Sequence, residues 1–306
     1  MLNLPLLSPS ALDDYVATVE LSRLKKSGPA DCEKIFRYGA FLGSVIRAYP
    51  TLDRAMDQAR EHISLREQSG KSVANGSVIL ASALARSKGR FSRSWHAPHG
   101  GLWGCLILAD TILPQFRNFL PLIPGIACCE AVRQEGASAA TIRWVNDVLL
   151  MGKKMAGFLI EGFRSPVHGE QYHLIGFGIN LNNSGFPQDL KSSAISLGQA
   201  CETQVDIASF ALSFLAKLRF YTGLLFYEEE QWLARGGLRD YHDEHPLLKR
   251  WKELSDTIGR RVTFGYDVME KPQYKAKVTG VTDDCGLILR HDDGTSSVEH
   301  SGEIRY

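Results

Sequence analysis

The chain has 306 residues, 44% hydrophobic and 23% charged, with a formal net charge of +1. This composition is typical of a globular protein with a substantial core, and the low net charge excludes a global field that attracts nucleic acid or an acidic membrane. Six cysteines without zinc-ligand spacing, and the absence of a secretory signal or a membrane-length apolar run, favour reduced thiols and a cytoplasmic location.

The first third of the chain predicts two helices and three strands. Residues 11–28 have the pattern of one amphipathic helix, and residues 51–68 have helical spacing with Thr51 as a possible N-cap. Strands are expected for the short apolar runs at 44–50, 77–84 and 102–110. Residues 116–135 then predict a helix that carries its two prolines in its first part.

The second part of the chain predicts a sheet followed by helices and a small β-barrel. Three strand-like runs with short connections follow one another, at 141–152, 153–164 and 171–183. Residues 206–226 predict a helix, and a second helix is expected at 227–238. From residue 257 short strands alternate with turns. We therefore expect an α+β fold, with a central mixed sheet, helices on one of its faces, and a small SH3-like barrel.

A basic loop is the first candidate for chemistry. The stretch "RSKGRFSRSWHAPHGG" at 86–101 places four cations among glycines and serines. Backbone N–H groups and guanidinium groups of such a loop can enclose a phosphate, and an indole can stack on a base. A solvated basic turn is the alternative.

Two charged pairs interrupt apolar strands in "RWVNDVLLMGKKMAGFLIEG" at 143–162. Asp147 and Lys154 suit a metal-bound phosphoryl group, because Mg²⁺ is often held by a carboxylate together with substrate phosphates. The alternative is a hairpin whose tip exposes Lys153 and Lys154. A third signal is "GFGIN" at 176–180, in which the glycines allow close approach and Asn180 can pair with an adenine edge.

In this order the motifs resemble those of the biotin protein ligase family. The family pattern Gly-Arg-Gly-Arg-x-x-Arg-x-Trp-x-Ser-Pro-x-Gly corresponds to "SKGRFSRSWHAPHG". Its Lys-Trp-Pro-Asn-Asp and Lys-x-Ala-Gly-x-Leu-x-Glu correspond to "RWVND" and "KMAGFLIE", and its Gly-x-Gly-x-Asn strand to "IGFGINLN". The tail "SGEIRY" resembles the end of the family's C-terminal barrel. The resemblance runs from about residue 40 to the end.

The resemblance implies that ATP and biotin form biotinyl-5′-adenylate, and that a lysine of a biotin carboxyl carrier domain then takes the biotin. The catalytic positions are Arg90, Lys154 and Asp147, with Asp147 also associated with Mg²⁺. The implied biotin contacts are Thr51, Arg90, Lys154 and Gly157. The implied ATP contacts are Lys88, Gly89, Arg93, Trp95, Asn146 and Asn180.

The sequence departs from the family pattern near the biotin end. The family's Ser-Thr-Asn is "PTL" at 50–52, and the glutamine usual before the glycine-rich loop is missing from "SALARS" at 82–87. A lipoate or octanoate ligase or transferase therefore stays open, as does a non-catalytic regulator that binds biotin or a nucleotide.

We expect three regions: an N-terminal extension at 1–35, a catalytic domain at 36–255 and the barrel at 256–306. Some family members carry an N-terminal winged helix and repress transcription. Because residues 1–35 are too few for such a domain, we expect no binding of nucleic acid. We also expect no membrane contact, and a homodimer is possible within the family.

Overall fold

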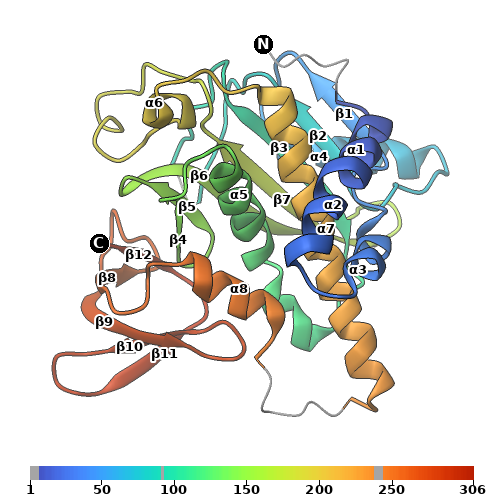
Figure 1. The fold of residues 1–306 in the computed structure, drawn as a ribbon. Helices are drawn as coiled ribbons and strands as arrows, with labels where there is room; N and C mark the ends of the chain where they lie inside the picture. The colour runs from blue at the N-terminus through green and yellow to red at the C-terminus, as the bar shows by residue number, and fades with distance from the viewer. Residues whose placement is uncertain (1–6, 91–92, 238–243) are drawn as a thin grey trace.

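Seven strands form one mixed sheet in the computed structural model, which describes residues 7–90, 93–237 and 244–306 (Figure 1). The strand order is β1-β2-β3-β7-β6-β5-β4, in which β1 and β2 are parallel and the other neighbours antiparallel. The strands are β1 (Ile46–Tyr49), β2 (Ser77–Ala81), β3 (Leu102–Ala109), β4 (Thr141–Arg143), β5 (Asp147–Leu150), β6 (Lys153–Arg164) and β7 (Gln171–Ile179). The mixed sheet is as the sequence predicts, except that the first of the three central runs forms two strands, β4 and β5.

Helices cover both faces of this sheet, so the expectation of helices on one face is wrong. On one face α5 (Leu122–Gln134) and α7 (Ile207–Ala234) pack, and Phe214 of α7 lies 5.3 Å from Phe177 of β7 between ring centroids. On the other face α4 (Ala55–Gln68) packs its buried Met56, Ala59 and Ile63. Coverage on both sides explains why β2 and β3 are almost fully buried and read as continuous apolar runs.

Helix boundaries differ from the prediction at three places. The helix α4 begins at Ala55 with Arg54 as its N-cap, so Thr51 does not cap it. The helix predicted at 116–135 is a 3-10 helix, η3 (Pro114–Phe119), followed by α5, because Pro121 has no N–H to continue the first. The separate helix predicted at 227–238 is instead the end of α7, which runs unbroken for 28 residues; Leu238 lies outside the described residues.

Five further α-helices and one π-helical segment complete the described helices. The helix predicted at 11–28 is present as α1 (Pro9–Tyr15), a π-helical segment η2 (Val16–Glu20) and α2 (Leu21–Ser27). It is followed by α3 (Cys32–Gly39). The sequence analysis predicted none of α3, α6 (Leu197–Cys201) and α8 (Pro246–Leu254).

A buried ion pair fixes the N-terminal helix to α7. Lys217 of α7 and Glu20 of η2 are 2% and 1% exposed, and their ammonium and carboxylate groups are in direct contact. Lys217 Nζ also donates to Gln134 Oε1 of α5 at 2.7 Å. Removing Glu20 would leave the Lys217 ammonium buried without this carboxylate, whereas Glu20 also pairs with Arg23 at 2.9 Å, so the contact specifies where residues 9–27 dock.

The C-terminal part is a five-stranded antiparallel sheet in the order β11-β10-β9-β8-β12, as predicted for the tail. Trp144 joins it to the rest of the chain, and Trp251 fixes α8 to the segment between β4 and β5. Trp144 Nε1 donates to the Cys285 carbonyl at 3.4 Å, and Trp251 Nε1 to the Val145 carbonyl at 2.8 Å. Its strands are β8 (Arg261–Gly265), β9 (Tyr274–Val281), β10 (Leu287–Arg290), β11 (Ser296–Glu299) and β12 (Glu303–Arg305). The division at 255/256 stays a prediction.

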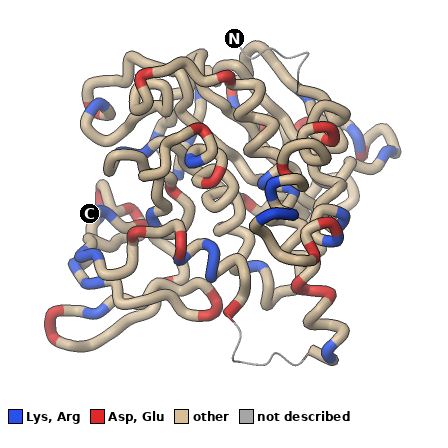
Figure 2. Tube along the Cα trace, in the orientation of Figure 1, with Lys and Arg blue, Asp and Glu red and all other residues tan. Residues whose placement is uncertain are grey.

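Positive and negative residues are both scattered over the fold, in keeping with the low net charge (Figure 2). Cys105, Cys128 and Cys129 are fully buried, and burial raises the pKa of the Cys129 thiol to about 12. Among the described helices, none combines the length and apolarity that crossing a membrane requires.

Candidate active site

A cavity of about 610 Å³ opens on the α4 face of the sheet. Its floor is formed by β6 and β7, and one wall by residues 87–90 and 93–96 of the basic loop. Residues 189–194 and β12 of the C-terminal sheet close other sides. Segments far apart in the sequence thus meet at one site, which the sheet holds in place.

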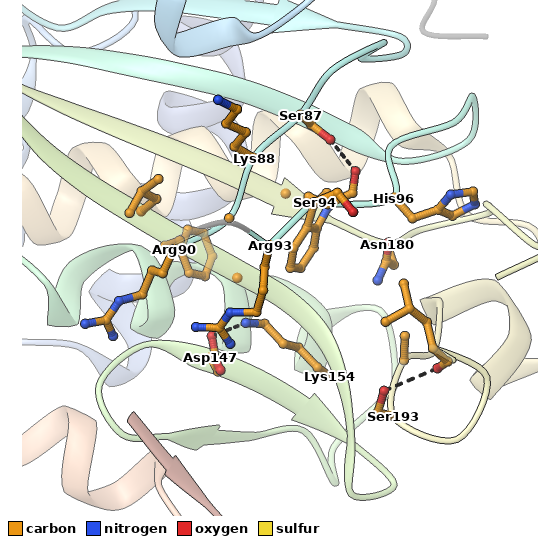
Figure 3. A pocket seen from close by; sticks show the side chains of 18 of the residues that line it. Ser87, Lys88, Arg90, Arg93, Ser94, His96, Asp147, Lys154, Asn180 and Ser193 are labelled. Atoms are coloured by element: carbon orange, nitrogen blue, oxygen red, sulfur yellow. Dashed lines mark hydrogen bonds and ion pairs between the residues drawn. The ribbon is translucent and has the colours of Figure 1, made fainter. Parts of the chain in front are cut away.

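Asp147 and Lys154 meet at one wall of this cavity (Figure 3). Asp147 begins β5 and Lys154 is the second residue of β6, and the two strands form a hairpin whose tip is Met151 and Gly152, both with positive φ. Lys154 Nζ lies 2.7 Å from Asp147 Oδ1, and Arg143 Nη2 lies 2.8 Å from Asp147 Oδ2. The tight turn exposes Met151, in keeping with the hairpin interpretation. Lys154 points back to the Asp147 carboxylate instead, in keeping with the interpretation as a charged site.

Opposing effects set the ionisation of this cluster. Burial would raise the pKa of Asp147, but the charges and hydrogen bonds of Lys154 and Arg143 outweigh it and lower the pKa to about 2. Burial would lower the pKa of Arg143, but Asp147 raises it. The Asp147 carboxylate and the Arg143 guanidinium therefore stay charged at neutral pH.

The basic loop folds over the cavity and is held by the C-terminal sheet. It turns back on itself, with Gly89 N donating to the Arg93 carbonyl at 2.8 Å and Trp95 N to the Ser87 carbonyl at 3.2 Å. Arg90 Nη1 donates to the Gly302 carbonyl at 2.7 Å, and Arg93 pairs with the Glu303 carboxylate. Glu303 is 14% exposed and also lies 3.8 Å from Arg90 Nε. The last strand therefore positions two guanidinium groups beside the cavity.

Glycines form the floor beneath Trp95. Gly157 of β6 and Gly178 of β7 are direct partners in the ladder. A Cβ on Gly178 would lie 2.6 Å from Trp95 Nε1, and one on Gly157 would lie 2.7 Å from Lys154 Cε. The indole and the lysine stem can therefore lie flat on the sheet only because side chains are missing there. Lys154 Nζ also lies 5.3 Å from the centroid of the Trp95 ring.

Residues 59–180 match the model of the biotin/lipoate A/B protein ligase family. These residues therefore contain a domain similar to that of the family. The matched residues include the basic loop, the Asp147–Lys154 hairpin and the glycine floor, so the family match and the cavity describe the same region.

Relatives of this ligase domain extend the match beyond those residues. The bifunctional ligase/repressor BirA of Bacillus subtilis is 28% identical over 243 residues, which cover 78% of this chain and 68% of that protein. The biotin–[acetyl-CoA-carboxylase] ligase of Paracoccus denitrificans is 34% identical over 105 residues, or 34% of this chain and 43% of that one. A biotin protein ligase from Aquifex aeolicus, solved with biotin and ATP, has the same fold, with a TM-score of 0.64 at 20% identity over 85% of this chain and 97% of that chain.

The cavity of the ligase domain brings together all but one of the predicted site residues. Asn180 lies in the same cavity, apart from Lys154 (Figure 3). Its Oδ1 accepts a 3.0 Å hydrogen bond from Asn183 Nδ2. Thr51 is exposed and does not line the cavity. The predicted residues that line it are Lys88, Gly89, Arg90, Arg93, Trp95, Asn146, Asp147, Lys154, Gly157 and Asn180.

Sequence reasoning missed the contributions of Arg143 and Glu303. Arg143 appeared only as part of a motif, and its place four residues before Asp147 was the available signal. Glu303 lies 210 residues from its partner Arg93, and no local pattern could pair them. The motif "SGEIRY" identified the C-terminal segment as part of the family pattern, but it did not indicate the contact between Glu303 and Arg93.

The residues at the cavity do not fit a resident metal ion. Both carboxylate oxygens of Asp147 are engaged by cations. Among the described residues no group of three His, Cys, Asp or Glu side chains is placed to hold a metal. A cation at this site would more naturally enter together with substrate phosphates.

Proposed function

We propose that this chain is an ATP-dependent biotin protein ligase. In the first step biotin and ATP give biotinyl-5′-adenylate and pyrophosphate. In the second, a lysine of a biotin carboxyl carrier domain takes the biotin as an amide. The observation that carries the proposal is the convergence of Lys154, Arg90 and Arg93 on a glycine-floored cavity. The named relatives, which include biotin ligases, support it.

In the first step a carboxylate oxygen of biotin attacks the α-phosphorus, and the bond to the β-phosphate oxygen breaks. Lys154 supplies a positive charge where the carboxylate and the α-phosphate meet. Lys88, Arg90 and Arg93 of the loop neutralise the remaining phosphates. To do so Arg93 exchanges its contact with Glu303 for one with phosphate. Mg²⁺ enters as part of the nucleotide substrate, bound to the phosphates.

Trp95 and Asn180 hold the adenylate. The indole covers the floor and keeps water from the reactive anhydride, while Asn180 and Asn146 offer hydrogen bonds to the nucleotide. Because a pKa of about 2 makes Asp147 a weak base, its role is to hold Lys154 and to attract the incoming lysine ammonium, rather than to remove its proton.

The carrier domain, a homodimer and a cytoplasmic location belong to this proposal. The deciding experiment is ATP–pyrophosphate exchange with purified protein, Mg²⁺ and biotin. Biotin-dependent exchange supports the proposal. Its absence, in protein shown to be folded, would favour a non-catalytic regulator that binds the same ligands.

A further inference from the structure

The cavity continues along β6 past the charged cluster around Lys154. Because every second residue of a strand lies on the same face, Gly157, Leu159 and Glu161 follow one another there at intervals of about 7 Å. Gly157 lies beside the Lys154 side chain. Leu159 lines both the cavity and an adjoining pocket of about 380 Å³, which Glu161 also lines. The adjoining pocket therefore extends the site away from Lys154.

The middle of this extended site is apolar. Gly176 is the ladder partner of Leu159, and a Cβ on Gly176 would lie 2.7 Å from Met56 Sδ, so the thioether rests on the glycine backbone. Leu84 and Leu159 line the cavity and belong to the same apolar cluster as Met56. A ligand that passes this point therefore gains from methylene groups and loses from polar ones.

The far end is cationic, because Arg54 and Lys88 line both the cavity and the adjoining pocket. In Figure 3, Lys88 lies at the opposite end of the view from His96. Arg54 is 20% exposed, and its Nη1 lies 3.3 Å from both carboxylate oxygens of Asp57. Within the described part of the chain, Nε and Nη2 of Arg54 donate to no protein group. These two nitrogens can bind one carboxylate in a bidentate pair.

Glu161 would repel an anion in the adjoining pocket, but an arginine already neutralises it. Its carboxylate is in direct contact with Arg60 of α4, which also lies 2.7 Å from Asp57. Asp57 is thus shared between Arg54 and Arg60 and is 52% exposed, so it offsets the charge of Arg54 only in part. The extended site therefore matches a ligand with an anionic group at each end and an apolar chain between them.

We propose that this site also activates medium-chain α,ω-dicarboxylic acids, with one carboxylate at Lys154 and the other at Arg54. The inference rests on the proposed ATP-dependent adenylation and names a further substrate class for the same cavity. An oxygen of the first carboxylate bonds to the α-phosphorus, the bond from that phosphorus to the β-phosphate oxygen breaks, and pyrophosphate leaves. The second carboxylate forms no covalent bond and holds the acid in place.

The test is ATP–pyrophosphate exchange with the whole chain and Mg²⁺, comparing suberate, octanoate, succinate, biotin and no acid. Octanoate matches suberate in carbon number but lacks the second carboxylate, and succinate has both carboxylates on a shorter chain. We expect kcat/KM for suberate to exceed that for octanoate and for succinate by about 10-fold or more, the effect of one charge-assisted hydrogen bond. A value for suberate no higher than that for octanoate overturns the inference, and biotin-dependent exchange in the same assay then leaves the proposed function intact. Exchange with none of the acids overturns both.

Arg54→Gln tests where the second carboxylate binds. The Arg54 side chain does not cap α4, so the variant removes the charged donors without removing a helix cap. We expect kcat/KM for suberate to fall by about 10-fold or more, mainly through KM, and kcat/KM for octanoate to stay unchanged. The control is Arg164→Gln, at the exposed end of β6 and outside the cavity, which should change neither value. Equal losses for suberate and octanoate in Arg54→Gln, with the fold confirmed by circular dichroism, contradict the assignment.

Discussion

Lys154 Nζ lies 2.7 Å from Asp147 Oδ1, although the two residues belong to different strands of the central sheet. The hairpin tip at Met151 and Gly152 reverses the chain, and the bulge after Val148 adjusts the register so that the two side chains meet. The backbone thus fixes an ion pair at the ends of two neighbouring strands. The first predictions below concern this pair.

Replacing Lys154 should abolish most of the first step. We expect Lys154→Ala to lower biotin-dependent ATP–pyrophosphate exchange by about 100- to 1,000-fold, because it removes a preorganised positive charge from the reacting groups. The control is Lys153→Ala, whose Nζ donates to the Lys191 carbonyl at 3.3 Å. Equal losses in both variants would argue against a specific role for Lys154.

The low pKa of Asp147 predicts a pH-dependent contribution to stability. A carboxylate whose pKa is lowered from 3.8 to about 2 by folding stabilises the protein above the unfolded pKa, and this contribution is lost as pH falls toward 2. It amounts to about 2 kcal/mol at neutral pH. Urea unfolding of wild type and Asp147→Asn should show a difference in free energy that shrinks by about 1 kcal/mol between pH 6 and pH 3. A constant difference would contradict the assignment of the low pKa to Asp147.

Asp147→Asn should also stop turnover of a carrier domain while the fold stays intact. The amide no longer attracts the incoming ammonium or balances Lys154 and Arg143. Transfer of biotin to a carrier domain can be followed by mass spectrometry, with circular dichroism as the check on folding. Normal transfer would remove Asp147 from the second step.

Arg90 of the basic loop should keep the adenylate bound in the cavity. In Arg90→Gly we expect release of biotinyl-5′-adenylate to rise by about 10-fold or more, because a charge-assisted contact of the loop is lost. Rapid filtration followed by chromatography measures the released adenylate. Arg86→Gly is the matched control, since Arg86 is 79% exposed and faces Asp53. A wild-type release rate in Arg90→Gly would be inconsistent with this role.

Glu303 should control how open the basic loop is. Glu303→Gln weakens the contacts to Arg93 and Arg90, and opening of the loop should increase by about 10- to 100-fold. Trypsin cleavage after Arg90 or Arg93 reports this opening. Glu299→Gln removes a charge from the same sheet at a contact with Tyr274, and should leave cleavage unchanged.

The buried pair of Lys217 and Glu20 should matter for stability rather than catalysis. Lys217→Met leaves the Glu20 carboxylate with Arg23 as its remaining cation, and we expect a loss of about 1 to 3 kcal/mol in the free energy of unfolding. Adding Glu20→Leu to the Lys217→Met variant should recover part of the lost free energy of unfolding. Lys25→Met, at an exposed pair with Glu33, should change little. Urea denaturation at pH 7 measures all of these variants.

Short-range patterns allowed much of the fold and of the candidate site to be predicted from the sequence. The apolar runs of β2, β3, β6 and β7 predicted the sheet, and the six residues between Asp147 and Lys154 formed one recognisable hairpin. The end of α7 was predicted as a separate helix because its acidic run suggests a solvated surface. The apolar stretch and the acidic run of α7 nevertheless form one continuous helix, because no proline or capping residue separates them.

The remaining differences depend on tertiary contacts. Whether α4 lies on the same face as α7 is decided by chain connections, which local periodicity does not report. The position of Thr51 depended on where α4 starts, and the start lies four residues later, at Ala55. The pairing of Glu303 with Arg93 spans most of the chain and has no local signature.

The contact between the basic loop and β12 has a consequence for the order of folding. Arg90 and Arg93 are held by residues 212 and 210 positions later in the chain, so this arrangement has a very high sequence separation. Contacts of that kind form after local ones, since a long segment must first be ordered to bring the ends together. We therefore expect refolding to pass through a species with a formed central sheet and an unfastened loop. Burial of apolar surface should then recover before ATP-dependent activity does.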